Sequence, residues 1–200
     1  TITVDNEDSN QNTGAIAALN IGVIINSSCN GVTIKSKNKN KYLSAGMIVC
    51  NHNSVKGKVS KVMNCYAYNC NVTNAALAGG ICVRMLDGST VENCYTRKIT
   101  FNNIKTSSRG ELVASFSDSF VKNCFYEYGK RAIGEQVAPK SNLAYSDTIT
   151  DPSKAIPTSE VSTRLNKWIS TTGISNFSEY KFTEWTQEED IPAIFINERE

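Results

Sequence analysis

The stretch that decides the fold is AGGICVRMLDGSTVENCY, residues 78–95. After Ala78 it has two glycines and a short apolar run, turns at Asp87-Gly88 and ends at Asn93-Cys94-Tyr95. The same order of features occurs three more times between residues 14 and 125. Self-similarity at a period of about 20 to 50 residues is typical of solenoids and other repeat folds. We therefore interpret residues 78–95 as part of a repeating unit.

The repeats align on a glycine and on an asparagine. The aligned glycines are Gly14, Gly46, Gly80 and Gly110, and the aligned asparagines are Asn26, Asn64, Asn93 and Asn123. The last three asparagines are each followed by cysteine and an aromatic residue. A Lys- and Gly-rich insertion at 54–60 lengthens the second repeat, and we expect it to form a longer loop at a corner.

Short strands recurring in this order predict an all-β fold, a parallel β-helix (β-solenoid) of about four coils. A short strand stacked on the equivalent strand of the next repeat gains a hydrogen-bond ladder and buries its inward side chains. Each repeat should contribute about three β segments. A β-sandwich with irregular strands is the alternative, and the ordered recurrence of glycine, apolar strand and Asn-Cys-aromatic favours the solenoid.

Stacked coils should place like residues above one another. We expect the residues two positions after the aligned glycines to form one interior column. The cysteines that follow the aligned asparagines should form a second column, in which a serine takes the place of cysteine in the first coil. The asparagines predict a ladder of side-chain amides that bond along the stack. The interior columns are Ile16, Ile48, Cys82 and Leu112, and Ser27, Cys65, Cys94 and Cys124.

The seven cysteines predict buried, uncharged thiols rather than a metal or redox site. Their number is odd, and no Cys-x-x-Cys pair occurs, so the spacings of zinc sites and redox motifs are absent. Side chains that stack in register point the same way, which is poor geometry for a disulfide. We expect free thiols and no cofactor.

The repeats end near residue 128, which divides the chain into a solenoid, residues 1–128, and a C-terminal wrap and cap, residues 129–200. Val161, Leu165 and Trp168 recur at helical spacing and predict a helix over 158–170. Residues 180–185 and 191–196 predict two strands joined by an acidic turn. An open solenoid end exposes strand edges and core, so we expect this tail to cover one.

The chain resembles the GLUG-motif proteins, repeat-bearing extracellular proteins common in gut Bacteroidetes. Their repeats are similar to Ala78-Gly79-Gly80-Ile81-Cys82-Val83 followed by Asn93-Cys94-Tyr95. Their C-terminal segments are similar to Leu165-Asn166, Trp185 and Pro192-Ala193-Ile194. The resemblance implies a β-helix-like fold and a secreted or cell-surface setting, often within longer adhesin-like proteins. It implies no catalytic residues.

Few residues of the repeat region have the chemistry of a catalytic site. Residues 13–125 contain four acids, of which Asp87 and Asp118 occupy equivalent turns and form the one candidate pair. Turn residues that satisfy the local backbone are the simpler interpretation. His52, the single histidine, lies between two asparagines and is predicted to face solvent at a turn. We predict no catalytic or metal-binding residues.

The basic residues give the sharper hypothesis. Residues 13–125 carry 13 Lys and Arg against the four acids, and Lys35, Lys37, Lys39 and Lys41 alternate with Ser and Asn. On an extended segment these four would project to one side. They predict a site for an anionic partner such as an acidic glycan. A solvated corner where lysines discourage edge pairing is the simpler interpretation, and we favour it from the sequence. Nucleic acid is disfavoured because no aromatics are interleaved.

Together these features predict a non-enzymatic extracellular interaction module, either a cell-surface adhesion element or a spacer. Its partner would be an extracellular protein or a glycan, and an anionic polysaccharide is one candidate. The alternative is a carbohydrate-active protein, an acidic-glycan binder or a lyase-like β-helix, which would need a groove with clustered acids or an aromatic row. No run of 18 apolar residues occurs, so no transmembrane segment is expected.

Overall fold

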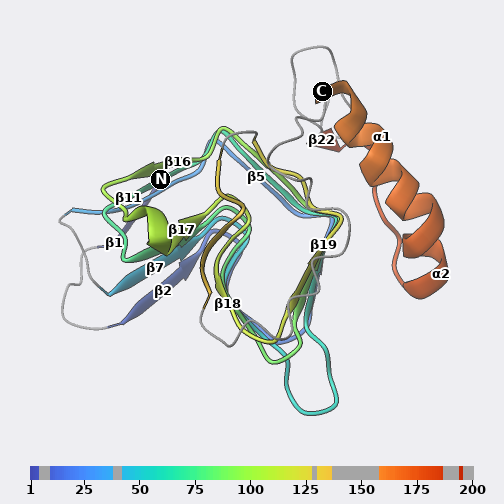
Figure 1. Ribbon diagram of the computed structural model, residues 1–200, viewed down its shortest axis with the longest axis horizontal. Coiled ribbons are helices and arrows are strands. Elements are labelled where there is room, and N and C mark those ends of the chain that lie inside the picture. The colour runs from blue at the N-terminus through green and yellow to red at the C-terminus, as the bar shows by residue number, and fades with distance from the viewer. Residues whose placement is uncertain (5–9, 38–41, 128–129, 137–157, 187–193, 196–200) are drawn as a thin grey trace.

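The chain winds into a parallel β-solenoid of about four coils (Figure 1). The computed structural model describes residues 1–4, 10–37, 42–127, 130–136, 158–186 and 194–195. Each full coil visits five short strands in a fixed order, and equivalent strands of successive coils pair in parallel. The predicted fold class is confirmed, because a β-sandwich would pair its strands antiparallel.

Five sheets surround a common interior, and we number them I to V in the order in which a coil visits them. Sheet I contains β2 (Gln11–Gly14), β7 (Leu43–Gly46), β12 (Leu77–Gly79) and β17 (Arg109–Gly110). Sheet II contains β3 (Ala17–Asn20), β8 (Val49–Asn53), β13 (Cys82–Leu86), β18 (Val113–Phe116) and β20 (Ile133–Gln136). Sheet III contains β4 (Val23–Ile25), β9 (Lys61–Met63), β14 (Thr90–Glu92) and β19 (Phe120–Lys122). Sheet IV contains β5 (Ser28–Asn30), β10 (Tyr66–Tyr68) and β15 (Tyr95–Arg97). Sheet V contains β1 (Ile2–Val4), β6 (Thr33–Ser36), β11 (Asn71–Thr73) and β16 (Thr100–Asn102).

The prediction of about three β segments in each repeat is wrong, since a full coil has five. Strands of two to five residues separated by sharp corners show too little alternation to be recognised individually. The insertion at 54–60 forms the expected corner loop, between β8 and β9, closed by a bridge between Val55 and Lys58 (Figure 1).

The alignment on Gly80 is wrong by one residue, because Gly79 is the residue that pairs with Gly46 and Gly110. A Cβ on Gly79 would lie 1.8 Å from the carbonyl oxygen of Cys82. The chain turns so tightly from sheet I to sheet II that only glycine fits this corner. A Cβ on any other glycine of the column would likewise meet the carbonyl oxygen of the residue three positions later. The distance would be 1.9 Å for Gly14, 2.1 Å for Gly46 and 2.0 Å for Gly110.

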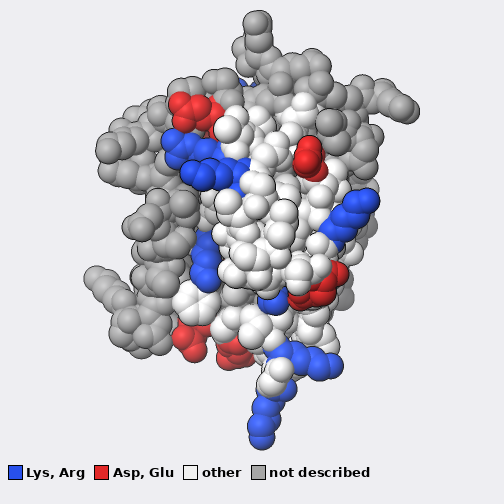
Figure 2. All heavy atoms as spheres, turned by 90° about the vertical axis from the view of Figure 1, so that its right-hand side faces the viewer, with Lys and Arg blue, Asp and Glu red and all other residues white. Residues whose placement is uncertain are grey.

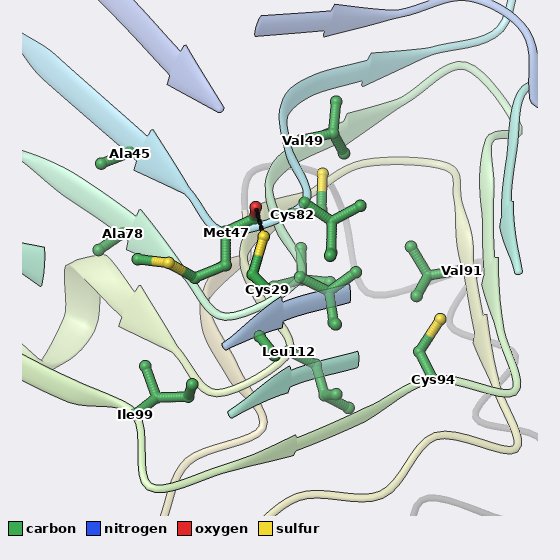
Figure 3. Packing of buried hydrophobic residues seen from close by; sticks show 14 of the residues in the cluster. Cys29, Ala45, Met47, Val49, Ala78, Cys82, Val91, Cys94, Ile99 and Leu112 are labelled. Carbon is green, nitrogen blue, oxygen red and sulfur yellow. Dashed lines mark hydrogen bonds between the residues drawn. The ribbon is translucent and has the colours of Figure 1, made fainter. Parts of the chain in front are cut away.

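The correction moves the predicted interior column by one residue in the third coil. Ile81, not Cys82, stacks with Ile48 and Leu112, and all three are fully buried. Cys82 is also buried, but it pairs with Val49 and Val113 in the next column. Figure 3 shows side chains from several sheets meeting in this interior. Ile16, at the start of the first column, is 43% exposed because it belongs to the first coil.

The asparagine ladder is confirmed. The side-chain Nδ2 of Asn64 donates to Asn26 Oδ1 at 2.8 Å, that of Asn93 to Asn64 Oδ1 at 2.7 Å, and that of Asn123 to Asn93 Oδ1 at 2.6 Å. All four residues have φ between 46° and 54°. Asparagine tolerates this left-handed conformation better than other non-glycine residues. The corner between sheets III and IV therefore explains why asparagine recurs there.

The predicted cysteine column is confirmed as well. Cys65, Cys94 and Cys124 are fully buried, and each Sγ donates to the carbonyl oxygen two residues earlier, at 3.1 to 3.2 Å. Ser27 makes the same bond to Ile25 at 2.9 Å, which explains why serine fits the first coil. All seven cysteines are free and buried. Burial raises the pKa of Cys29 to about 12, so that thiol stays uncharged.

The prediction that His52 faces solvent at a turn is wrong. It lies in β8 with its side chain inward, is fully buried, and pairs with Met85 of the next coil. Its Nε2 donates to the Thr90 carbonyl oxygen at 2.9 Å, and its Nδ1 accepts from Asn20 Nδ2 at 3.1 Å. These partners suit a neutral imidazole, and burial lowers the pKa of His52 below its usual 6.5.

Replacing His52 by glutamine should make stability less sensitive to acid. The unfolded chain takes up a proton on His52 below about pH 6.5, whereas the folded protein resists it, so stability falls as the pH falls. We expect the free energy of unfolding in urea to decline from pH 7.5 to 5.5 more steeply for the native protein than for His52→Gln. Other titrating groups are common to both proteins. If the free energy of unfolding declined equally steeply with pH in both proteins, His52 would not be a neutral imidazole in the folded protein.

The helical part of the tail packs along the side of the solenoid, although we expected it to cover an end. The helix α1 (Thr158–Trp168) continues through a π-helical turn (Ile169–Gly173) into α2 (Ile174–Asn176). Its buried Val161 and Leu165 pack on Tyr66, Tyr95 and Phe125, which are equivalent residues of successive coils. In Figure 1 the helix accordingly lies beside the corner between sheets III and IV. The predicted helix and its apolar face are confirmed.

The asparagine ladder also holds the chain that follows the helix. Asn26 Nδ2 donates to the Lys181 carbonyl oxygen, and Asn64 Nδ2 to that of Thr183, both at 2.8 Å. The indole Nε1 of Trp185 donates to Asn64 Oδ1. The short strands β21 (Trp185–Thr186) and β22 (Ile194–Phe195) then pair antiparallel. The first overlaps the predicted strand 180–185 only at Trp185, and the second lies within the predicted strand 191–196.

The predicted end of the solenoid at residue 128 comes too early, because strand β20 lies beyond it. This strand pairs in parallel with β18, so that Ile133 stacks on Val113. The backbone of Leu112 bonds to Ala132, only 20 residues further along the chain. The fourth coil therefore takes a shorter path than the others, which hides this strand from an alignment on a period of about 30. A short 3-10 helix, Thr106–Ser108, precedes β17.

Candidate functional site

The outward surface of sheet V carries a regular array of polar side chains. Ile34 and Val72 point inward and are fully buried, so the residues on either side of each point outward. We call this surface the polar face. It consists of Thr3, Thr33, Lys35, Asn71, Thr73, Thr100 and Asn102.

The polar face is ordered by hydrogen bonds within a coil and between neighbouring coils. Asn102 Nδ2 donates to Asn71 Oδ1 at 3.0 Å, and Thr73 Oγ1 donates to the same oxygen at 3.3 Å. Adjacent strands of a sheet lie about 4.8 Å apart. Hydroxyl and amide groups therefore recur at that spacing along the face, where they can bind the hydroxyl groups of an extended polymer.

Two of the four lysines predicted as a ligand site belong to the described residues. Lys35 lies in β6, is exposed, and pairs in register with Thr3 on one side and Thr73 on the other. Lys37 follows β6 directly and is exposed. Lys39 and Lys41 lie outside the described residues. The start of the alternating pattern therefore forms an extended strand, as predicted. The ammonium group of Lys35 lies within the polar face.

A groove of about 790 Å³ lies between the helical segment and the last two coils; we call it the helix groove. Figure 2 shows this side of the molecule, where basic and acidic side chains surround a largely uncharged centre. The solenoid contributes Glu92, Lys122, Asn123 and Phe125 to it. The helical segment contributes Glu160, Thr163, Arg164, Lys167, Trp168, Thr171, Thr172, Asn176 and Phe177.

Glu92 is an acid of the helix groove whose burial the sequence did not indicate. It is 4% exposed and pairs in register with Met63 on one side and Lys122 on the other. Burial raises the pKa of Glu92, while Lys122 and Lys61 counteract that shift. Glu160 and Arg164 form an exposed ion pair at 3.0 Å on the neighbouring helix.

Glu111 is a second buried acid, inside the solenoid. It follows Gly110 and therefore occupies the column in which Met47 is buried and Gly80 has no side chain. It is 3% exposed, and its Oε2 has no hydrogen-bond partner among the described residues. Burial raises the pKa of Glu111 to about 8, opposed by Lys130. Its place directly after the aligned Gly110, equivalent to that of Met47 after Gly46, is the signal in the sequence that could have found it.

Asp87 and Asp118 do occupy equivalent corners, as predicted. Both are exposed and left-handed, with φ of 58° and 46°. The Gly88 N–H donates to the Asp118 carbonyl oxygen of the next coil. Within the part of the chain that the structure describes, no three His, Cys, Asp or Glu side chains are grouped to hold a metal ion. The two aspartates act there as turn residues.

Comparison of the chain with models of known protein families, with curated proteins and with solved structures found no match. The polar face and the helix groove therefore provide the basis for assigning a function. No helix among the described residues has both the length and the apolar character to span a bilayer.

Proposed function

We propose that the protein is a non-enzymatic interaction module that binds an acidic glycan along the polar face. The observation that carries the proposal is the in-register array of Thr and Asn side chains around Lys35. Hydroxyl and amide groups match the hydroxyl groups of a sugar chain, and an exposed ammonium matches a uronate carboxylate.

Rigidity supports this function. The outward side chains of Asn71, Thr73 and Asn102 are bonded to one another. Strand β11, which carries the first two, is paired on both sides, and β16, which carries Asn102, is paired with β11. A surface that is already ordered loses little conformational entropy when a ligand binds. A sugar chain running along the solenoid axis would meet similar groups at every coil.

The proposed setting is extracellular or at a cell surface. The resemblance of residues 78–95 to GLUG-motif repeats supports this setting. The seven free cysteines are compatible with it, because burial raises the pKa of Cys29 and Cys50 to about 12 and about 11, and uncharged buried thiols react slowly. A spacer role within a longer adhesin is the second candidate, favoured by the continuous stacking of coils.

Charge reversal at Lys35 should weaken binding to an acidic glycan. We expect Lys35→Glu to raise the Kd for polygalacturonate about fivefold at low salt, a change of about 1 kcal/mol. The difference should shrink as salt screens the charges. Isothermal titration calorimetry at low and moderate salt measures both effects.

Lys58→Glu provides the matched control, because Lys58 is also exposed but lies in the loop at 54–60. It should leave the Kd unchanged. If both variants weakened glycan binding equally, the effect would come from the net charge of the protein, which would contradict a site on the polar face. Absence of binding by the native protein would favour the spacer role.

A further inference from the structure

The helix groove combines an excess of positive charge with one buried acid. Lys122, Arg164 and Lys167 line it, and Lys61 lies close by, with its Nζ 4.8 Å from the centre of the Phe177 ring. Glu92 is the buried acid, and Glu160 is engaged with Arg164. The balance of charge favours an anionic ligand group, and Lys167 is an exposed lysine of this lining.

The remaining walls are of two kinds. Hydroxyl and amide groups come from Thr163, Thr171, Thr172, Asn123 and Asn176, and apolar surface comes from Phe125, Trp168 and Phe177. Trp168 and Phe177 stack with ring centres 5.8 Å apart. A sugar ring has the same two kinds of surface, with hydroxyl groups at its edge and C–H groups on its faces. An inorganic anion would make no use of the apolar wall.

We propose that the helix groove is a second binding site and that it takes a carboxylated sugar, a hexuronate unit. The volume of about 790 Å³ lies in the range of small-molecule sites, about 300 to 1,000 Å³. The sugar carboxylate faces Lys122 and Lys167, and Glu92 accepts a hydrogen bond from a ring hydroxyl. The site shares its ligand class with the polar face but does not depend on binding there.

Glu92 is the residue that separates a sugar site from a plain anion site. A buried carboxylate repels a phosphate or sulfate ion but accepts hydrogen bonds from hydroxyl groups. Met63 occupies the adjacent position of the same column and is fully buried under the helical segment. Methionine therefore fits this column, and Glu92→Met removes the acceptor without introducing a foreign shape.

NMR titration with D-glucuronate, D-glucose and inorganic phosphate tests the proposal. Glucuronate should shift the backbone amide signals of Lys122, Asn123, Thr171 and Asn176, and it should bind at least tenfold more tightly than glucose or phosphate. Glu92→Met and Lys167→Gln should each weaken glucuronate binding by threefold or more. Lys105→Gln, an exposed lysine away from the groove, should leave the binding unchanged.

The outcomes against the proposal are equally specific. If phosphate bound as tightly as glucuronate, the groove would be an anion site without sugar recognition. If glucose bound as tightly as glucuronate, the lysines would have no role in binding the carboxylate. Unchanged affinity in Lys167→Gln, whose exposed side chain is not needed for folding, would also overturn it. Shifts confined to Thr73 and Asn102 would leave the polar face as the glycan site and reject the groove.

Discussion

Gly79→Ala should prevent stable folding. The added Cβ would lie 1.8 Å from the carbonyl oxygen of Cys82 and 2.6 Å from its carbonyl carbon. These are backbone atoms, and they cannot withdraw because Gly79 is paired with both Gly46 and Gly110. Relieving the clash requires breaking the ladder of sheet I in an inner coil. We expect a loss of about 5 kcal/mol, comparable with the whole stability of many domains.

Gly22→Ala is the matched control for that experiment. The nearest atom to a Cβ on Gly22 is Asn20 Oδ1 at 3.9 Å, and its φ is not positive. Its effect should stay within about 0.5 kcal/mol. Circular dichroism during urea unfolding measures both variants. A Gly79→Ala protein as stable as Gly22→Ala would show that the corner is more open than described.

Asn64→Ala should destabilise the protein by about 4 kcal/mol and release the tail. Asn64 is fully buried with φ of 54°, a conformation that costs alanine about 1–2 kcal/mol. Its Oδ1 accepts bonds from Asn93 and Trp185, and its Nδ2 donates to Asn26 and Thr183. Each donor left unpaired in a buried position costs a further 1–3 kcal/mol, roughly.

Two further variants separate these causes. Asn64→Gly keeps the left-handed backbone and should recover about 1 kcal/mol relative to alanine. Asn103→Ala changes an exposed left-handed asparagine with one side-chain bond, to Asn74 at 2.9 Å, and should cost about half as much as Asn64→Ala. Tryptophan fluorescence should report exposure of Trp185 in the Asn64 variants alone. Equal losses at both positions would contradict the docking role of Asn64.

The columns could be predicted because equivalent residues of successive repeats stack on one another, so that an alignment of the repeats gives the columns. Asn64, Asn93 and Asn123 each precede cysteine and an aromatic residue, so one alignment brings them into register. The register of the glycines could not be settled in the same way, because Gly79 and Gly80 are adjacent. The choice between them depends on the Cys82 carbonyl oxygen, a backbone contact without a sequence signal.

The position of the tail illustrates a different limit. The spacing of Val161 and Leu165 predicts a buried helix face, but it does not say which surface covers that face. The partners proved to be Tyr66, Tyr95 and Phe125, the aromatic residues of the Asn-Cys-aromatic motif. That motif therefore serves the interior through its cysteine and the tail through its aromatic residue.

The two candidate sites were unequally accessible to sequence reasoning. Lys35 could be placed on an extended strand from its alternation with polar residues, and its neighbours Thr3 and Thr73 follow once the coils are aligned. The helix groove joins Glu92 to Lys167, which lie far apart in the chain, across an interface without a repeat. Only the packed structure brings these residues together.

Nuclear Overhauser contacts between successive coils test the central claim of in-register parallel stacking most directly. Val62, Val91 and Val121 occupy one column of sheet III, and Ile34, Val72 and Phe101 occupy one column of sheet V. We predict contacts between neighbours within each column, amide-to-α-proton contacts of parallel strands, and stepwise contacts along the amides of Asn64, Asn93 and Asn123. Strong α-proton to α-proton contacts between these strands, as in antiparallel pairs, or contacts shifted by one residue would contradict the account.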